Sequence, residues 1–301
     1  MPSVSANGIT IEYQSFGDPG APPLLLIMGL GGQMIHWHER FCATLADRGL
    51  RVIRFDNRDA GRSTVMGGGA AWDVQAMFQA WLMRQPLRAP YLLSDMAEDA
   101  VGLMDALDIE RAHIVGASMG GMIGQLLAIH HRERLLSLTS IMSTPGGYGF
   151  PAPKPASLMA LLSPAPADRE GFARRALKVG EALNAGSWPL DEEKVMAVGR
   201  ESFDRGYHRE GVLRQTAAVL ASGSREEALR GVSTPTLVLH GERDPLVPIS
   251  AGRATAAAIP DARFVPMSQM GHYMPPQTWG PLIEHISDHI SRSLHGFAPA
   301  S

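Results

Sequence analysis

The stretch Gly116-Ala117-Ser118-Met119-Gly120 stands between an apolar run at residues 112–115 and a helix-like stretch that begins at Gly121. A strand, a sharp turn and a helix in this order predict a tight elbow, because glycines two positions before and after the serine let the backbone fold back. The elbow exposes the Ser118 hydroxyl. The N–H of Met119 and the positive end of the next helix would face negative charge developing on an attacked group. A glycine-rich loop with a chance serine is the alternative, which the flanking strand and helix disfavour.

The composition is typical of a globular protein. Of 301 residues, 45% are hydrophobic and 19% are charged, and the formal net charge is −3. This charge disfavours nucleic acid and anionic membranes, so we expect neither partner. The N-terminus lacks the features of a signal peptide, and the longest apolar run, near residues 24–28, is too short to span a bilayer, so a cytoplasmic location is predicted. The single cysteine, Cys42, is predicted to be a core residue.

The order of the predicted elements is typical of an α/β fold. The Asn7-Gly8 step predicts an antiparallel hairpin over residues 3–16. Further strands are predicted over 24–28, 51–55, 112–116 and 135–142, and helices over 37–48, 94–107 and 121–131. Ser94 is the predicted N-cap of the helix that ends at residue 107. Alternation of strands and helices predicts a mostly parallel central sheet flanked by helices.

The pattern changes after Thr144. Six prolines between residues 145 and 166 precede helix-like segments without a convincing strand, at 169–184, 192–204 and 211–222. Strand patterns return at 234–240 and 262–266, before a last helix over 277–294. We therefore predict a core of residues 1–144 and 231–301, interrupted by a helical cap, or lid, over 145–230. Residues 64–94, rich in aromatic and methionine side chains, have either a short helix over 74–83 that overhangs the site or an ordinary packing segment.

Three residues with catalytic potential follow three different predicted strands, in the order Ser118, Asp244, His272. Because the carboxyl ends of parallel strands converge on one crevice, we expect these side chains to meet. A serine hydroxyl is a poor nucleophile at neutral pH, so it needs a base; His272 can take its proton and later return it to the leaving group. Asp244 would fix the imidazole tautomer and stabilise the imidazolium.

Competing residues are less well placed. Glu242 is the only carboxylate near Asp244, and Asp244 is preferred because it lies deeper in its loop, beside Pro245. His285 and His289 have the four-residue spacing of metal ligands on a helix. No third ligand is obvious, so we interpret both as part of a solvated helix face and predict no metal site.

Four residues, Gly29-Leu30-Gly31-Gly32, follow the first buried strand. Glycines let the backbone approach the nucleophile, so the N–H of Leu30 is predicted to complete an oxyanion hole with the N–H of Met119. A dinucleotide-binding loop would need glycine or alanine at Met34, so no such cofactor is predicted.

The polar run at residues 56–63 follows the next strand. It is predicted to be a tight structural turn held by Asp56 and Arg58, with a ribose or metal site as the alternative. Together with the elbow, Asp244, His272 and the glycine loop, the pattern Asp56-x-Arg58-x-x-Gly61-x-Ser63 resembles the α/β-hydrolase superfamily over nearly the whole chain.

Within that superfamily, the chain resembles esterases of the aclacinomycin methylesterase type. They share Met-Gly in place of the common His-Gly before the oxyanion loop, seen here as Met28-Gly29. The departure from His-Gly removes a polar group that often braces this loop, which leaves the support of the loop, though not its backbone donor, open.

The triad and the resemblance together predict a cofactor-independent carboxylic ester hydrolase with an acyl-serine intermediate. Its substrate would be an apolar ester of small to medium size, with a methyl ester among the candidates. Dehalogenases and epoxide hydrolases of the superfamily carry aspartate at the elbow, so Ser118 argues against both. A perhydrolase or cofactor-free haloperoxidase would use the same triad, and a ligand-binding receptor is the non-enzymatic alternative. The small-molecule substrate is the expected partner, and a monomer or a homodimer is expected.

Overall fold

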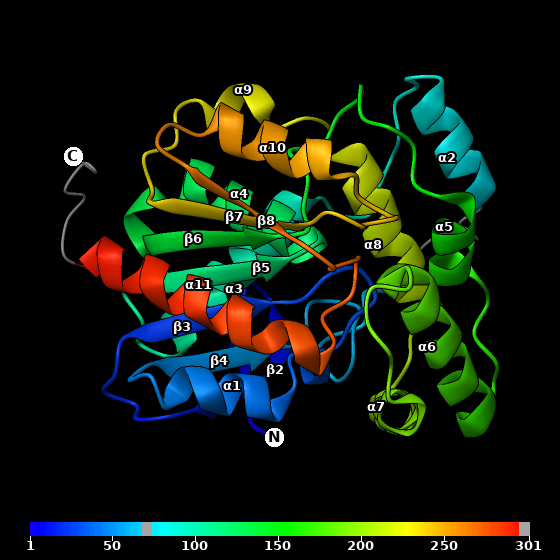
Figure 1. Ribbon diagram of the computed structural model, residues 1–301, viewed down its shortest axis with the longest axis horizontal. Helices are drawn as coiled ribbons and strands as arrows, with labels where there is room; N and C mark the ends of the chain where they lie inside the picture. The colour runs from blue at the N-terminus through cyan, green and yellow to red at the C-terminus, as the bar shows by residue number, and fades with distance from the viewer. Residues whose placement is uncertain (68–73, 295–301) are drawn as a thin grey trace.

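The central feature of the protein is an eight-stranded sheet, seen in a computed structural model that describes residues 1–67 and 74–294 (Figure 1). The strands lie in the order β1-β2-β4-β3-β5-β6-β7-β8. They are β1 (Ser3–Ala6), β2 (Ile9–Phe16), β3 (Pro23–Ile27), β4 (Arg51–Phe55), β5 (Ala112–Ala117), β6 (Leu135–Ile141), β7 (Thr236–Gly241) and β8 (Arg263–Met267). Strands β3 to β8 are parallel, whereas β2 is antiparallel to both neighbours. The predicted mostly parallel α/β sheet is confirmed.

The first two strands form the predicted hairpin. Its turn is Asn7-Gly8, and both residues have positive φ angles, of 48° and 75°. Asparagine and glycine tolerate this conformation better than other residues, which explains why this dipeptide fixes the turn.

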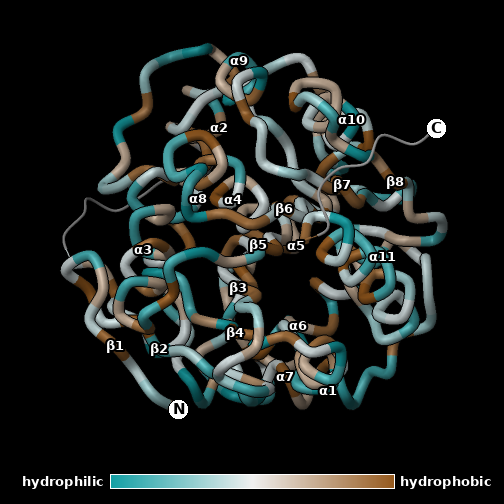
Figure 2. The backbone as a smooth tube through the Cα atoms, turned by 90° about the vertical axis from the view of Figure 1, so that its left-hand side faces the viewer, coloured by the Kyte–Doolittle hydropathy of each residue, from teal (hydrophilic) through white to brown (hydrophobic). Residues whose placement is uncertain are grey.

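Helices cover both faces of the sheet. Side chains of α1 (Glu39–Ala46) and α11 (Pro276–Leu294) pack on the face that receives Leu24 and Leu26 of β3. The opposite face, which receives Leu25 and Ile27, is covered by α3 (Leu93–Ala106), α4 (Met119–His130) and α10 (Ile249–Ala258). Successive residues of a strand point to opposite faces, so a strand covered on both faces is apolar throughout. Figure 2 shows the hydrophobic segments gathered in the central strands.

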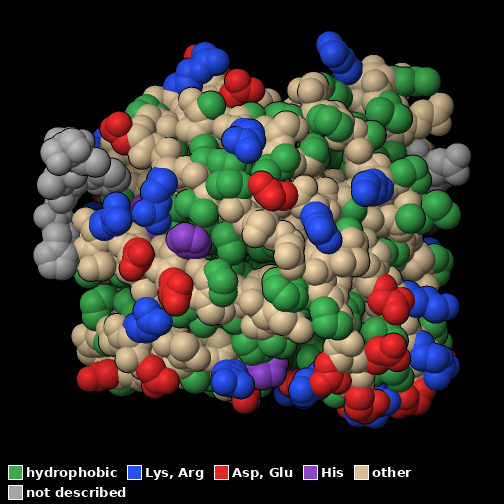
Figure 3. Space-filling view, viewed as in Figure 1, with side chains coloured by type: hydrophobic (Ala, Val, Ile, Leu, Met, Phe, Trp, Pro, Cys, Tyr) green, Lys and Arg blue, Asp and Glu red, His purple; other side chains and the backbone are tan. Residues whose placement is uncertain are grey.

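The segment between β6 and β7 contains only helices, and we call residues 145–230 the helical insertion. Its elements are α5 (Pro155–Leu162), α6 (Arg169–Asn184), α7 (Glu192–Arg205), α8 (Arg209–Ala221) and the short α9 (Glu226–Leu229). Helices α5 to α8 stand together with α2 (Val74–Leu82) at one side of the sheet (Figure 1). Helix α9 instead packs against α10 and α4. Acidic and basic side chains are intermingled over α6 and α7, where they form ion pairs (Figure 3).

Several elements differ from the sequence-based expectation. Ser94 is not an N-cap: α3 begins at Leu93, and the carboxylate of Asp95 accepts the N–H of Leu92 at 2.7 Å. Helices α5 and α10 were not predicted, because one lies in a proline-rich stretch and the other is rich in alanine without a clear apolar stripe. The short helix expected near residues 74–83 is α2, and residues 68–73 of that stretch lie outside the described part of the chain.

None of the helices in residues 1–67 and 74–294 combines the length and the apolar character needed to cross a membrane.

Candidate active site

The elbow places Ser118 between β5 and α4. Ser118 has φ 55° and ψ −119°, an unfavourable conformation for a residue with a side chain. Two hydrogen bonds hold the Ser118 backbone in this conformation. The Ser118 N–H donates to the carbonyl oxygen of Ile141 at 2.9 Å, and the Ser143 hydroxyl donates to the backbone carbonyl oxygen of Ser118 at 2.8 Å. Helix α4 begins at Met119, two residues earlier than predicted, so its first turn starts directly after the serine.

The elbow requires glycine on both sides of the serine. A Cβ atom at Gly116 would lie 2.1 Å from the carbonyl oxygen of Gly120. A Cβ atom at Gly120 would lie 2.1 Å from the carbonyl oxygen of Ile27, in the neighbouring strand β3. Neither backbone atom can move without breaking the sheet or the helix, so neither position can carry a side chain.

Ser118, His272 and Asp244 form a continuous chain of hydrogen bonds. The Ser118 hydroxyl oxygen lies 2.9 Å from His272 Nε2, and His272 Nδ1 lies 2.7 Å from Asp244 Oδ2. The Asp244 side chain is fully buried, the His272 side chain is 5% exposed, and Ser118 is half-buried. The three side chains of the predicted triad therefore lie within hydrogen-bonding distance, although 154 residues separate Ser118 from His272.

The loop after β7 holds Asp244 as a carboxylate. Its Oδ1 accepts the N–H groups of Leu246 and Val247, at 2.9 and 2.8 Å. Burial acts to raise the pKa of Asp244. The charge of His272 and hydrogen bonds from the His240 and His272 rings outweigh burial, so this pKa lies well below its usual range. Asp244 can thus remain charged beside His272 at neutral pH.

The backbone of His272 is fixed by the helical insertion. The His272 N–H donates to the carbonyl oxygen of Leu183, near the end of α6, at 2.8 Å. A Cβ atom at Gly271 would lie 2.4 Å from the same oxygen, so the chain can approach α6 only through glycine. A side chain at position 271 would therefore push the histidine loop away from α6.

Other residues considered from the sequence lie apart from this chain of hydrogen bonds. Glu242 is exposed, and its carboxylate has no hydrogen-bond partner among the described residues. His289 is buried, not solvated as predicted, and its Nε2 lies 3.2 Å from the carbonyl oxygen of Pro235. Burial raises the pKa of the Cys42 thiol to about 12, so this core cysteine stays protonated and is not a competing nucleophile. Within residues 1–67 and 74–294, no group of three metal-ligating side chains occurs.

The glycine loop after β3 lies against the serine. A Cβ atom at Gly29 would be 3.0 Å from Ser118 Cβ. The Asn57 side-chain amide donates to the carbonyl oxygen of Met28 at 2.9 Å, and the Gly31 N–H donates to the Gln215 side chain at 2.8 Å. The Asn57 and Gln215 amides thus brace the loop without the histidine of the common His-Gly pair. Neither residue was singled out from the sequence, because each contact joins residues far apart in the chain. In the described part of the chain, the N–H groups of Leu30 and Met119 donate to no protein acceptor.

The polar run after β4 is the predicted tight turn, and Asp56 holds it. The Asp56 carboxylate accepts hydrogen bonds from the N–H groups of Met34 and Arg62, at 2.7 and 3.0 Å. The Ser63 hydroxyl donates to the backbone carbonyl oxygen of Asp56. Gly61 is required because a Cβ atom there would lie 2.1 Å from Asp56 Oδ2. Each Asp56 oxygen has a protein donor, which leaves the carboxylate unsuited to a ribose or a metal ion.

Arg58 does not hold this turn, contrary to the prediction. Its guanidinium leaves the turn and forms two hydrogen bonds of 2.6 Å with Asp99 of α3. The side chain also lies over the Tyr91 ring, with 4.9 Å between the guanidinium carbon and the ring centroid. Arg58 therefore fixes α3 to the core.

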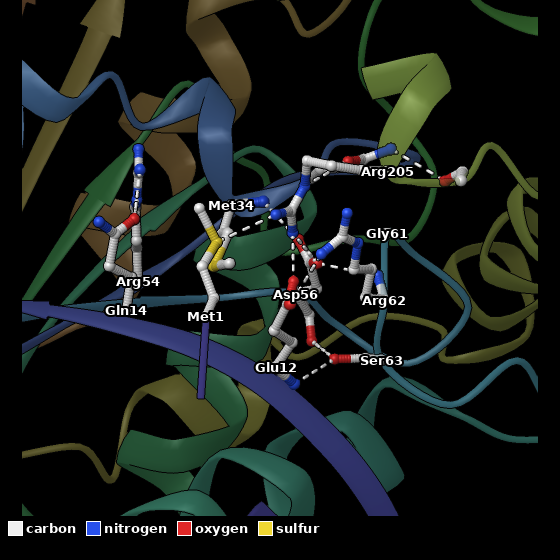
Figure 4. Close-up of polar contacts among 12 residues, drawn as sticks. Met1, Glu12, Gln14, Met34, Arg54, Asp56, Gly61, Arg62, Ser63 and Arg205 are labelled. Atoms are coloured by element: carbon white, nitrogen blue, oxygen red, sulfur yellow. Dashed lines mark hydrogen bonds and ion pairs between the residues drawn. The ribbon is translucent and has the colours of Figure 1, made fainter. Parts of the chain in front are cut away.

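Two arginines of the helical insertion form buried ion pairs with the turn. Arg205, at the end of α7, pairs with Asp56 and with Glu12 of β2, the latter at 2.7 Å (Figure 4). Arg214 of α8 pairs with Asp59 at 2.7 Å. All five side chains are at most 6% exposed. Helices α7 and α8 are therefore anchored to the core next to the glycine loop.

The chain is similar to known proteins over most of its length. The family described as "alpha/beta hydrolase fold" matches residues 22–276. The chain is 31% identical to rhodomycin D methylesterase DauP of Streptomyces sp. (strain C5), covering 95% of this chain and 96% of that protein. Rhodomycin D methylesterase DnrP of Streptomyces peucetius has the same identity and coverage. Putative carbamate hydrolase RutD of Caulobacter sp. (strain K31) is 28% identical, over 87% of this chain and 88% of that protein.

Among solved structures, the enol-lactonase of Burkholderia xenovorans LB400 has a TM-score of 0.73 and 24% identity, covering 96% of this chain and all of that one. This likeness shows the fold alone. The eight-stranded sheet, the family match over most of the chain and the similarity to the methylesterases lead to one conclusion: the chain belongs to the α/β-hydrolase family.

Proposed function

We propose that this protein hydrolyses carboxylic esters through an acyl-serine intermediate on Ser118. The observation that carries the proposal is the hydrogen-bond chain from the Ser118 hydroxyl through His272 to Asp244, at 2.9 and 2.7 Å. This order matches a nucleophile, a base and an acid that orients the base. The similarity to two proteins named rhodomycin D methylesterase supports ester hydrolysis, and a methyl ester, which would release methanol, is a proposed substrate.

The first half of the reaction forms the acyl-enzyme. The Ser118 oxygen attacks the ester carbonyl carbon while His272 Nε2 takes the hydroxyl proton, and the carbonyl oxygen becomes an oxyanion. The N–H groups of Leu30 and Met119 stabilise that oxyanion, and both lack a protein acceptor within the described residues. When the C–O bond breaks, the imidazolium of His272 gives its proton to the departing alkoxide, which leaves as an alcohol.

The second half releases the acid. Water attacks the acyl carbon, His272 takes a proton from the water, and the C–O bond to Ser118 breaks as the same proton returns to the serine oxygen. Asp244 remains ionised throughout, because its two oxygens accept hydrogen bonds from Leu246, Val247 and His272. The reaction needs only groups of the protein and water.

The helical insertion is proposed to cover Ser118 as a lid and to select apolar esters. Support comes from the contact between Leu183 and His272 and from the half-buried side chains of Leu158, Leu161 and Leu162 on α5.

The test is hydrolysis of methyl esters and p-nitrophenyl esters by the purified protein, beside the Ser118→Ala variant. Ester hydrolysis that falls by about 10⁴-fold or more in the variant is expected. A variant that retains a tenth of the activity would show that Ser118 is not the nucleophile. Bromination that depends on peroxide and exceeds ester hydrolysis would instead assign a haloperoxidase or perhydrolase, and tight binding of an ester without turnover would assign a receptor.

A further inference from the structure

Gln215 is a fully buried amide that connects the helical insertion to the glycine loop. It lies in the middle of α8, and its side chain has no exposed surface. Its Oε1 accepts the N–H of Gly31 at 2.8 Å, and its Nε2 donates to the carbonyl oxygen of Arg58 at 2.8 Å. Because both ends of the amide are bonded, its two possible orientations are not equivalent, and the oxygen faces Gly31.

The contact lies beside the proposed oxyanion donor. The Gly31 nitrogen belongs to the peptide unit on the C-terminal side of Leu30, next to the unit that contains the Leu30 N–H. The hydrogen bond to the Gly31 N–H therefore restricts the orientation of Leu30. Val212, one turn before Gln215 on α8, packs on the same residue: a Cβ atom at Gly31 would lie 3.1 Å from a Val212 methyl group. Gly31 also has a φ of 65°, which favours glycine.

The other hydrogen bonds of the glycine loop do not hold the peptide between Leu30 and Gly31. Asn57 holds the loop at the carbonyl oxygen of Met28, and the Gly32 N–H closes a turn to the carbonyl oxygen of Gly29 at 3.1 Å. Neither contact reaches the peptide between Leu30 and Gly31. Among the described residues, the only partner of the Gly31 N–H is Gln215.

We propose that Gln215 is a positioning residue that holds the Leu30 N–H toward the oxyanion, so that a helix of the insertion contributes to the chemical step as well as to substrate binding. This inference rests on the proposed ester hydrolysis. A donor stabilises the transition state only when it is already aimed at the developing charge, and loss of one oxyanion donor costs on the order of 10²–10³ in kcat. Loosening a donor without removing it costs less, so we expect a fall in kcat of about 10- to 100-fold.

The decisive variant is Gln215→Met, which keeps the length of the side chain and removes the strong acceptor. With p-nitrophenyl acetate as substrate, kcat should fall by about 10- to 100-fold while KM changes by less than about threefold. An aryl trifluoromethyl ketone, which adds to the serine and carries an oxyanion, should lose affinity by a factor similar to the fall in kcat. A structural role alone would not produce this parallel loss.

Two further variants at the same position separate the acceptor from the packing. Gln215→Glu keeps an oxygen for the Gly31 N–H, so its kcat should stay at least about fivefold above that of Gln215→Met. Gln215→Asn shortens the side chain by one carbon, so its kcat should fall as far as that of Gln215→Met. This variant provides the test if Gln215→Met does not fold. Equal losses in the glutamate and methionine variants would overturn the proposal.

Gln125 offers a matched control. It is equally buried, and its amide also bridges the core and the helical insertion, by donating to the carbonyl oxygen of Thr144 and accepting from Arg225. Among the described residues, its side chain forms no hydrogen bond with the glycine loop. Gln125→Met should lower the melting temperature and leave kcat within about threefold of the wild type. A loss of kcat equal to that of Gln215→Met would mean that destabilisation alone explains both variants.

The wild-type protein separates this inference from the proposed function. If the wild type hydrolyses neither p-nitrophenyl acetate nor the longer p-nitrophenyl and methyl esters, ester hydrolysis itself is refuted. If the wild type is active and Gln215→Met has wild-type kcat and ketone affinity, only the role of Gln215 is refuted.

Discussion

Replacing Asp244 with asparagine should leave His272 in the wrong tautomer. Two backbone N–H groups, from Leu246 and Val247, point at Asp244 Oδ1, so the amide oxygen of an asparagine would occupy that place. The amide nitrogen would then take the position of Oδ2 and donate to His272 Nδ1. With Nδ1 as the acceptor, the imidazole proton moves to Nε2, which lies 2.9 Å from the Ser118 oxygen and can no longer take the serine proton.

The expected loss is about 10⁴-fold in kcat, or about 5.5 kcal/mol of transition-state stabilisation. The assay is steady-state hydrolysis of p-nitrophenyl acetate at pH 7.5, with circular dichroism to show that the variant is folded. Because asparagine has the same shape and keeps the bonds at Oδ1, the fold should survive.

Glu242→Gln is the matched control for this substitution. Glu242 lies in the same loop and is exposed, and its carboxylate has no hydrogen-bond partner in the described structure, so kcat should remain within about twofold of the wild type. Wild-type activity in Asp244→Asn, together with an inactive Glu242→Gln, would refute the reasoning and assign the acid to Glu242.

Three further predictions concern the anchor of the insertion, the buried histidines and the lid. Arg205→Met should lower the free energy of unfolding by about 3–5 kcal/mol in urea titrations, because Asp56 would lose its buried partner; a change under 1 kcal/mol would contradict this. Burial lowers the pKa values of His113 and His289 to about 4, so the unfolded chain binds more protons between pH 6.5 and 4. The unfolding free energy should therefore fall as the pH drops through this window, by up to about 1.4 kcal/mol per pH unit for each histidine, and His289→Gln should reduce the slope; an unchanged slope would count against this. Across a series of acyl chains, kcat/KM should rise about fourfold per methylene until the pocket is full, and Leu161→Ala should flatten the rise; a flat wild-type profile would refute an apolar lid.

The local sequence pattern was sufficient to predict the strands of the sheet and their order along the chain. Runs of apolar residues marked the parallel strands, since these are buried on both faces, and the Asn7-Gly8 step marked the hairpin. The spacing of glycines around Ser118 was informative because Gly116 and Gly120 contact backbone atoms directly.

What could not be predicted depends on contacts between distant residues. Arg205 and Arg214 are ordinary helical residues in sequence, and only the folded chain brings them to Asp56 and Asp59, about 150 positions away. The burial of His289 likewise depends on packing against the strand that follows Pro235. Capping of α3 by Asp95 was missed because Ser94, one residue earlier, has an equally good capping side chain.

The central claim is that Ser118 carries the acyl group, and covalent trapping tests it most directly. The protein is mixed with an alkyl fluorophosphonate, or it is mixed with p-nitrophenyl acetate and the reaction is stopped rapidly. The intact mass and the peptide masses are then measured. A single adduct on Ser118 is predicted, absent in Ser118→Ala and formed far more slowly in His272→Ala, because the base that takes the serine proton is then missing. Turnover of esters with an adduct on another residue, or with wild-type labelling in His272→Ala, would contradict the account.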